Sequence, residues 1–193
     1  MTKREISIPN VFISYSWTTP EHEEWVLELA SRLMEENGVS VTLDKWDLVE
    51  GHDTYKFMES MVNSPDIDKV LIICDRGYME KANAGRGGVG TEAAIISPEV
   101  YTHNQQEKFI PIVSERDSQG GTYIPTFIKT RKYIDLSSEE TYEKGFEELL
   151  RNLYNRPLYR KPSLGSAPAF LFEDAPIRYK TTNVIKQLRD AIV

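Results

Sequence analysis

Residues 70–74 read Val-Leu-Ile-Ile-Cys, an uninterrupted apolar run of strand length. A strand that is covered by helices on both sides of its sheet lacks the apolar–polar alternation of a half-exposed strand. The run therefore predicts a fully buried strand of a parallel sheet, with helices packed on both faces.

Four other runs, rich in β-branched and aromatic residues, predict the rest of this sheet. They are residues 11–14, 39–43, 109–113 and 133–136. Pro111 lies inside the third of these and has no N–H to donate to a ladder. It predicts an edge position or a bulge.

Helical patterns separate the strands. Thr18–Glu21 supplies a capping hydroxyl and a Pro for a first turn, and Gly38 ends the segment. Further helices are expected at 55–62 and 93–100, and from 137 onward, with a polar loop at 75–84. Strands that alternate with helices predict an α/β fold with right-handed crossovers.

Length and composition suit one domain and a tail. The chain has 193 residues, of which 40% are hydrophobic and 27% charged. We expect one domain over residues 8–155. Residues 156–193, which are rich in Pro and carry a short amphipathic stretch near the end, are expected to form a linker or an extension.

Charge and motifs exclude several function classes. The 23 Lys and Arg against 30 Asp and Glu give a net charge of −7, which argues against binding to nucleic acid or to an anionic membrane. No membrane span and no signal peptide is apparent, and the single Cys74 suits a reducing compartment, so we expect a cytoplasmic protein. No metal-ligand spacing, nucleophile elbow or Walker loop is found.

One phosphate-binding pattern is present. Residues 85–90 read Gly-Arg-Gly-Gly-Val-Gly and fit GxGxxG. A dinucleotide fingerprint has its first Gly at the end of the first strand, whereas this one follows the third strand after a long polar segment. We interpret it as a flexible glycine loop.

The carboxyl ends of parallel strands meet at one edge of a sheet, where ligands of α/β proteins bind. Hydroxyl, carboxylate and indole groups follow the first three strands, which suits a sugar with an attached heteroaromatic ring. The candidate ligand-binding residues are Ser14, Tyr15, Trp17, Asp44, Trp46 and Asp47, and the candidate catalytic residue is Glu92.

Glu92 opens the predicted helix at 93–100, and Ile95 and Ile96 share its face. Its carboxylate is therefore expected to point toward the sheet. The alternative is structural: Glu92 caps the helix or pairs with a nearby cation such as Lys81 or Arg86. Trp17 and Trp46 could likewise simply cover the core, and Asp44 and Asp47 could be turn residues.

Six blocks of this sequence resemble the TIR superfamily, most closely its SEFIR branch. They read VFISYSW at 11–17, VTLDKWDL at 41–48, VLIICDRGY at 70–78, GVGTEAAIIS at 88–97, KFIPIV at 108–113 and LYNRPLYRKP at 153–162. The resemblance implies a flavodoxin-like three-layer sandwich with a five-stranded, mostly parallel sheet.

The resemblance also implies a function. Many prokaryotic TIR-type domains cleave the nicotinamide–ribose bond of NAD in antiviral defence, and they depend on a glutamate at the position of Glu92. Such a carboxylate can stabilise an oxocarbenium-like ribosyl centre. Active members commonly carry a Trp-Cys pair where this chain has Gly88-Val89. The aromatic wall that this Trp forms in the pocket must therefore come from other residues here.

We therefore predict an NAD hydrolase that is active once several copies assemble, with NAD as substrate and without metal or further cofactor. Self-association is expected through the loop after the second strand, which contains Leu48, Glu50, Gly51, His52 and Asp53. Two alternatives stay open. One is a non-enzymatic adaptor that binds its own kind, and the other is a sensor that binds NAD without cleaving it.

Overall fold

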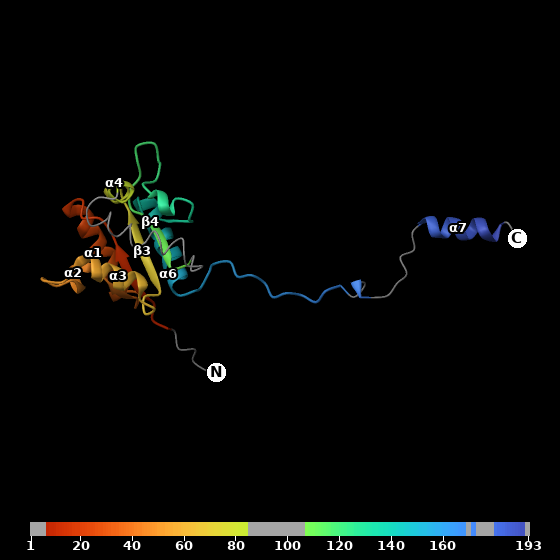
Figure 1. Ribbon diagram of the computed structural model, residues 1–193, viewed down its shortest axis with the longest axis horizontal. Coiled ribbons are helices and arrows are strands. Elements are labelled where there is room, and N and C mark those ends of the chain that lie inside the picture. Colours follow the sequence, from red (N-terminus) through yellow and green to blue (C-terminus); the bar gives the residue numbers. More distant parts are fainter. Residues whose placement is uncertain (1–6, 85–106, 169–170, 173–179, 192–193) are drawn as a thin grey trace. The chain divides into compact units, whose positions relative to one another are not determined.

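The computed structural model describes residues 7–84, 107–168, 171–172 and 180–191 (Figure 1). Contacts divide the chain into two units, Met1–Leu158 and Tyr159–Val193. The predicted helix at 93–100 and the glycine pattern at 85–90 lie outside the described residues.

The first unit is built on one five-stranded sheet in which every pair of neighbours is parallel. The spatial order is β2-β1-β3-β4-β5. The strands are β1 (Asn10–Ser14), β2 (Ser40–Thr42), β3 (Lys69–Cys74), β4 (Phe109–Val113) and β5 (Ile134–Asp135). The predicted parallel sheet is confirmed, and the apolar run at 70–74 forms its central strand, with no exposed surface.

Helices cover both faces of this sheet, which makes the three-layer sandwich. On one face α1 (Pro20–Glu35) and α6 (Glu139–Leu153) pack against Val11, Ile13 and Leu71. On the other, α3 (Thr54–Asn63) and α4 (Arg76–Ala84) pack against Phe12 and Val70. Successive residues of a strand point to opposite faces, so neighbours such as Val11 and Phe12 join different cores.

Side-chain caps fix where the two long helices begin. The Thr19 hydroxyl accepts a hydrogen bond from the His22 N–H at the start of α1, and the Ser138 hydroxyl accepts one from the Thr141 N–H at the start of α6. These bonds satisfy amides that have no partner within the helix. The helix starts predicted at 18–21 and 137–140 are confirmed.

The expectation that Pro111 marks an edge or a bulge is wrong, because β4 lies between β3 and β5. Backbone bonds join Ser114 N to Cys74 O and Leu136 N to Val113 O. Since alternate residues of a parallel strand face the same neighbour, the Pro111 nitrogen faces the β5 side. The β4–β5 ladder begins only at Ile112, so no donor is missed there.

The polar loop predicted at 75–84 is also wrong, since α4 occupies Arg76–Ala84. Its sequence is mostly Arg, Lys, Glu and Ala, which are good helix formers. Tyr78 alone is fully buried, so the segment lacks a clear apolar stripe. Two short elements complete the unit: α2 (Asp44–Asp47) and the 3-10 helix η1 (Thr126–Ile128).

The second unit contains α7 (Lys180–Asp190), on which Val184, Ile185 and Leu188 are exposed. Within the described residues, no helix combines the length and the apolar composition that crossing a bilayer requires.

Candidate functional site

The carboxyl ends of β1 and β2 bring two groups of predicted site residues together. Trp17 follows β1, and Asp44 opens α2, shortly after the end of β2. The Trp17 indole Nε1–H donates a hydrogen bond of 2.9 Å to an Asp44 carboxylate oxygen. The two residues are 27 positions apart in sequence and meet because both strands end at the same edge of the sheet.

Two indole groups of this edge are open to solvent. The exposed fraction is 58% for Trp17 and 42% for Trp46. Large aromatic residues near strand ends are usually buried over the edge of the hydrophobic core, and neither of these two is. An exposed indole with its N–H already bonded, as in Trp17, offers an aromatic face on which a heteroaromatic ring can stack.

Tyr15 lies directly before these groups and is only 3% exposed, yet its hydroxyl has no hydrogen-bond partner among the described residues. Burial raises the pKa of Tyr15, and the nearby charge of Asp44 raises it further. The hydroxyl is therefore neutral and keeps its proton. A buried neutral hydroxyl without a partner has a donor and lone pairs to offer to a ligand.

Other predicted ligand-binding groups already hold partners. The buried Ser14 hydroxyl bonds to the Tyr78 hydroxyl at 3.0 Å. The Asp47 carboxylate accepts from the Leu43 N–H at 2.9 Å, and a second oxygen of Asp44 accepts from the Lys45 N–H at 2.7 Å. Asp44 and Asp47 thus act as turn residues as well, and their ligand contacts stay predictions.

The sequence interpretation missed Asp75, which lies at the end of β3 and is 3% exposed. Its two oxygens accept from the Ser16 and Thr18 hydroxyls, each at 2.7 Å. They also accept from the backbone N–H of Gly77 and Tyr78. An Asp directly after an apolar strand is a helix-capping signal, but it carries that meaning only if a helix follows.

His22 of α1 lies beside this carboxylate. Its Nε2 is 3.9 Å from an Asp75 oxygen and has no hydrogen-bond partner among the described residues. Burial lowers the pKa of His22, against the opposing attraction of Asp75 and Glu115. The ring stacks on Trp25, with 6.3 Å between centroids.

The remaining predicted residues lie partly within and partly outside the described residues. In the proposed assembly loop Glu50, Gly51, His52 and Asp53 are exposed and Leu48 is half-buried. Glu92 lies outside the described residues. Burial raises the pKa of Cys74, which keeps its thiol protonated and unreactive.

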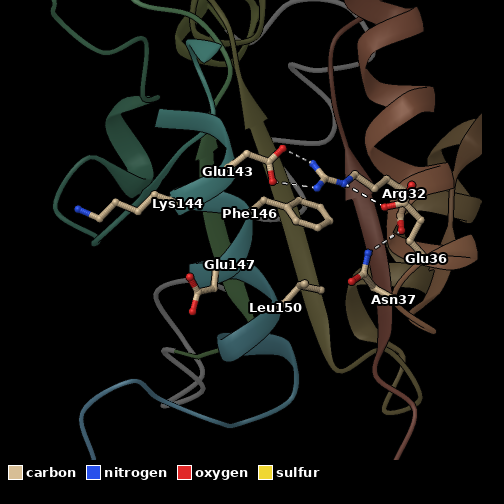
Figure 2. A pocket seen from close by; sticks show the side chains of 8 residues that line it. All are labelled: Arg32, Glu36, Asn37, Glu143, Lys144, Phe146, Glu147 and Leu150. Atoms are coloured by element: carbon tan, nitrogen blue, oxygen red, sulfur yellow. Dashed lines mark hydrogen bonds and ion pairs between the residues drawn. The ribbon is translucent and has the colours of Figure 1, made fainter. Parts of the chain in front are cut away.

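A hollow lies between α1 and α6, on the surface of one helical layer (Figure 2). Arg32 spans it, forming two 2.9 Å hydrogen bonds to the Glu143 carboxylate while its guanidinium lies 4.1 Å from the Phe146 ring centroid. Its cation is thus fully engaged by the protein. Because the Arg32 cation in this hollow is already engaged, the carboxyl edge of the sheet is the better candidate site.

Comparisons with known proteins agree on the fold. The model of a family described as TIR domain matches residues 11–150. A solved structure of a prokaryotic SEFIR domain is 48% identical and has a TM-score of 0.66; the match covers 81% of this chain and 99% of that one. The TIR domain of the Toll-related receptor TRR-2 from Hydra magnipapillata is 16% identical, has a TM-score of 0.54 and covers 74% of this chain and 96% of that one. No curated protein sequence gives a significant match.

Proposed function

Because the chain belongs to the TIR domain family, in its SEFIR branch, we propose that it is an NAD hydrolase that cleaves the bond between nicotinamide and ribose. The observation that carries the proposal is the group at the carboxyl edge of β1 and β2. There the exposed Trp17 indole donates to the Asp44 carboxylate, beside the buried Tyr15 hydroxyl, which has no hydrogen-bond partner among the described residues.

These groups match different parts of a dinucleotide. The Trp17 face suits stacking on a heteroaromatic ring, and the Tyr15 hydroxyl suits a hydrogen bond to a ribose or amide oxygen. An additional aromatic wall is needed here because Gly88-Val89 replaces the usual Trp-Cys pair. In our proposal Trp17 and Trp46 supply it, while Asp44, Asp47 and Ser14 contribute polar contacts.

The chemical step requires little of the protein beyond one charge. Cationic nicotinamide is already a good leaving group, so bond cleavage needs no general acid. The barrier lies in the oxocarbenium-like ribosyl centre. We assign Glu92 the role of stabilising that centre electrostatically, a kind of contribution that supplies several kcal/mol in well-organised sites. Neither a metal nor a further cofactor takes part.

The test compares nicotinamide release from NAD by the wild type, Glu92→Ala and Trp17→Ala. Loss of the catalytic carboxylate is expected to abolish release, whereas loss of the stacking face raises the KM for NAD roughly tenfold. Ile8→Ala is the matched control, because Ile8 is an exposed apolar side chain (67%) ahead of the opposite end of β1. Equal release by Glu92→Ala and wild type contradicts the assignment of Glu92.

We further propose that assembly activates the enzyme, as an effector domain of prokaryotic antiviral defence. The exposed loop after α2 supports this, because Val49 within it is 51% exposed. The same surface favours the second candidate function, an adaptor that acts through homotypic contacts alone. Trp46→Ala and Glu50→Lys are expected to weaken self-association measured by sedimentation. If the protein is an adaptor, the wild type self-associates but does not turn over NAD.

A further inference from the structure

Asp75 is a buried carboxylate that the proposed chemistry does not use. It joins two segments that are almost 60 residues apart: the loop between β1 and α1, and the first turn of α4. One oxygen accepts from Ser16 Oγ (2.7 Å) and Tyr78 N (2.9 Å), and the other accepts from Thr18 Oγ1 (2.7 Å) and Gly77 N (3.2 Å). Four donors satisfy a charge that would otherwise be costly to bury.

Two of those donors lie on either side of Trp17. The hydroxyls of Ser16 and Thr18 bind the same carboxylate, so the backbone between them is pinned at both ends. A third contact holds the middle, because Lys81 of α4 donates from Nζ to the Trp17 carbonyl oxygen at 3.3 Å. The backbone of Trp17 is thus fixed by α4, and only its indole reaches across to Asp44.

We propose that Asp75 is a positioning residue, which sets the Trp17 indole in the orientation that a ligand at the carboxyl edge requires. The ligand part of this inference rests on the proposed function, with NAD as the ligand. The structural part, that α4 holds Trp17 through Asp75, stands without it.

The bonding pattern explains why a carboxylate is needed. Each Asp75 oxygen accepts one backbone N–H and one hydroxyl. In Asp75→Asn one oxygen becomes an NH₂ group, which cannot accept from the backbone N–H that faces it. The remaining oxygen still accepts from one backbone N–H and one hydroxyl, and the NH₂ group can donate to the other hydroxyl. The second backbone N–H of α4 then faces a donor and loses its acceptor, which pushes the loop and the first turn of α4 apart on that side.

The close approach of the two segments supports the same conclusion. A Cβ at Gly77 would lie 2.3 Å from the Thr18 side chain, which is closer than atoms can pack. The Thr18 side chain therefore packs directly against the first turn of α4. Displacing either segment would carry the backbone of Trp17 with it.

The experiment observes Trp17 directly by ¹⁹F NMR of the full chain labelled with 5-fluorotryptophan. The three signals are assigned with single Trp→Phe variants. Spectra of Asp75→Asn are compared with those of Asp68→Asn, a matched control in which the carboxylate accepts from the Asn10 N–H at the amino end of β1. Trp25, packed edge-on against Tyr142 of α6, reports on the fold. Ser16→Ala/Thr18→Val provides a second route that leaves the cap of α4 in place.

NAD is then titrated into the Glu92→Gln background, in which the proposed hydrolysis is blocked. We expect Asp75→Asn and Ser16→Ala/Thr18→Val to shift or broaden the Trp17 signal and to weaken NAD binding roughly tenfold. An unchanged Trp25 signal is the fold control for Ser16→Ala/Thr18→Val alone, because His22 lies beside Asp75 and stacks on Trp25. Asp68→Asn should change neither the Trp17 signal nor the affinity.

Two results overturn the proposal. An unchanged Trp17 signal in both variants shows that Asp75 does not hold the indole, and a shifted signal with unchanged NAD affinity shows that its orientation does not matter for the ligand. If the Trp17 signal of the parent chain fails to respond to NAD at all, the proposed function fails at this edge. The spectra without NAD still decide whether Asp75 positions Trp17.

Discussion

At the scale of single residues, Tyr15 places a buried hydroxyl beside the proposed ligand site. It is buried and its hydroxyl is unpartnered among the described residues. A fold does not gain from such a group, because burying a polar atom without a hydrogen bond costs free energy.

Tyr15→Phe is therefore expected to raise the free energy of unfolding by up to about 1 kcal/mol while weakening NAD binding. Tyr78→Phe is the matched control, since the buried Tyr78 hydroxyl bonds to Ser14 at 3.0 Å and its loss should destabilise the fold by about 1 kcal/mol. Urea unfolding measures both changes. A Tyr15→Phe variant as destabilised as Tyr78→Phe would show that the Tyr15 hydroxyl serves the fold.

His22 predicts a dependence of stability on pH. Burial lowers the pKa of His22 below its usual value of 6.5, so between the two pKa values the unfolded chain binds a proton that the folded chain does not. Stability therefore rises with pH through this window and falls as the pH drops below about 6.5.

In a comparison of pH 7.5 with pH 5.5, wild type should lose up to about 1 kcal/mol more stability than His22→Phe. The measurement is chemical unfolding at both pH values, with His52→Gln at an exposed position as the control. Identical losses in wild type and His22→Phe would contradict the account.

At the scale of elements, the close packing of α6 on β5 predicts that a Gly→Ala change within the helix lowers the free energy of unfolding. Gly145 lies inside α6, where Gly→Ala normally stabilises a helix by about 1 kcal/mol. Here a Cβ would lie 2.2 Å from the Asp135 carbonyl oxygen, so α6 could not approach the strand. We expect Gly145→Ala to lower the free energy of unfolding by about 2 kcal/mol.

Gly165→Ala is the control, because among the described residues no atom beyond its chain neighbours lies within 4 Å of a Cβ at that position. Its urea midpoint should equal that of wild type. A Gly145→Ala protein that matches wild type would show that α6 can move away from β5 without cost.

The elements also show what a sequence can predict. The strands and the starts of α1 and α6 were predictable, because apolar runs and capping hydroxyls are local signals. Helix α4 was not, since its polar sequence buries little besides Tyr78. The meeting of Trp17 and Asp44 followed from two strands that share an edge, whereas the role of Asp75 depends on donors that only the folded loop brings to it.

At the scale of the whole molecule, both hydrophobic cores belong to the first unit. In the second unit every side chain whose burial is described is exposed. A chain that ends at Leu158 is therefore expected to unfold cooperatively, with a Tm within about 2 °C of that of the full chain. Calorimetry measures this, and a markedly lower Tm would show that the second unit stabilises the first.

We propose that this TIR domain hydrolyses NAD at the carboxyl edge of its sheet. The most direct measurement is a chromatographic time course of nicotinamide release over a range of protein concentrations, with Glu92→Ala beside the wild type. We expect the rate per wild-type chain to rise with concentration, and Glu92→Ala to release nothing while folding and assembling normally. Absence of nicotinamide from a wild-type sample shown to be assembled would exclude NAD hydrolysis and favour the adaptor.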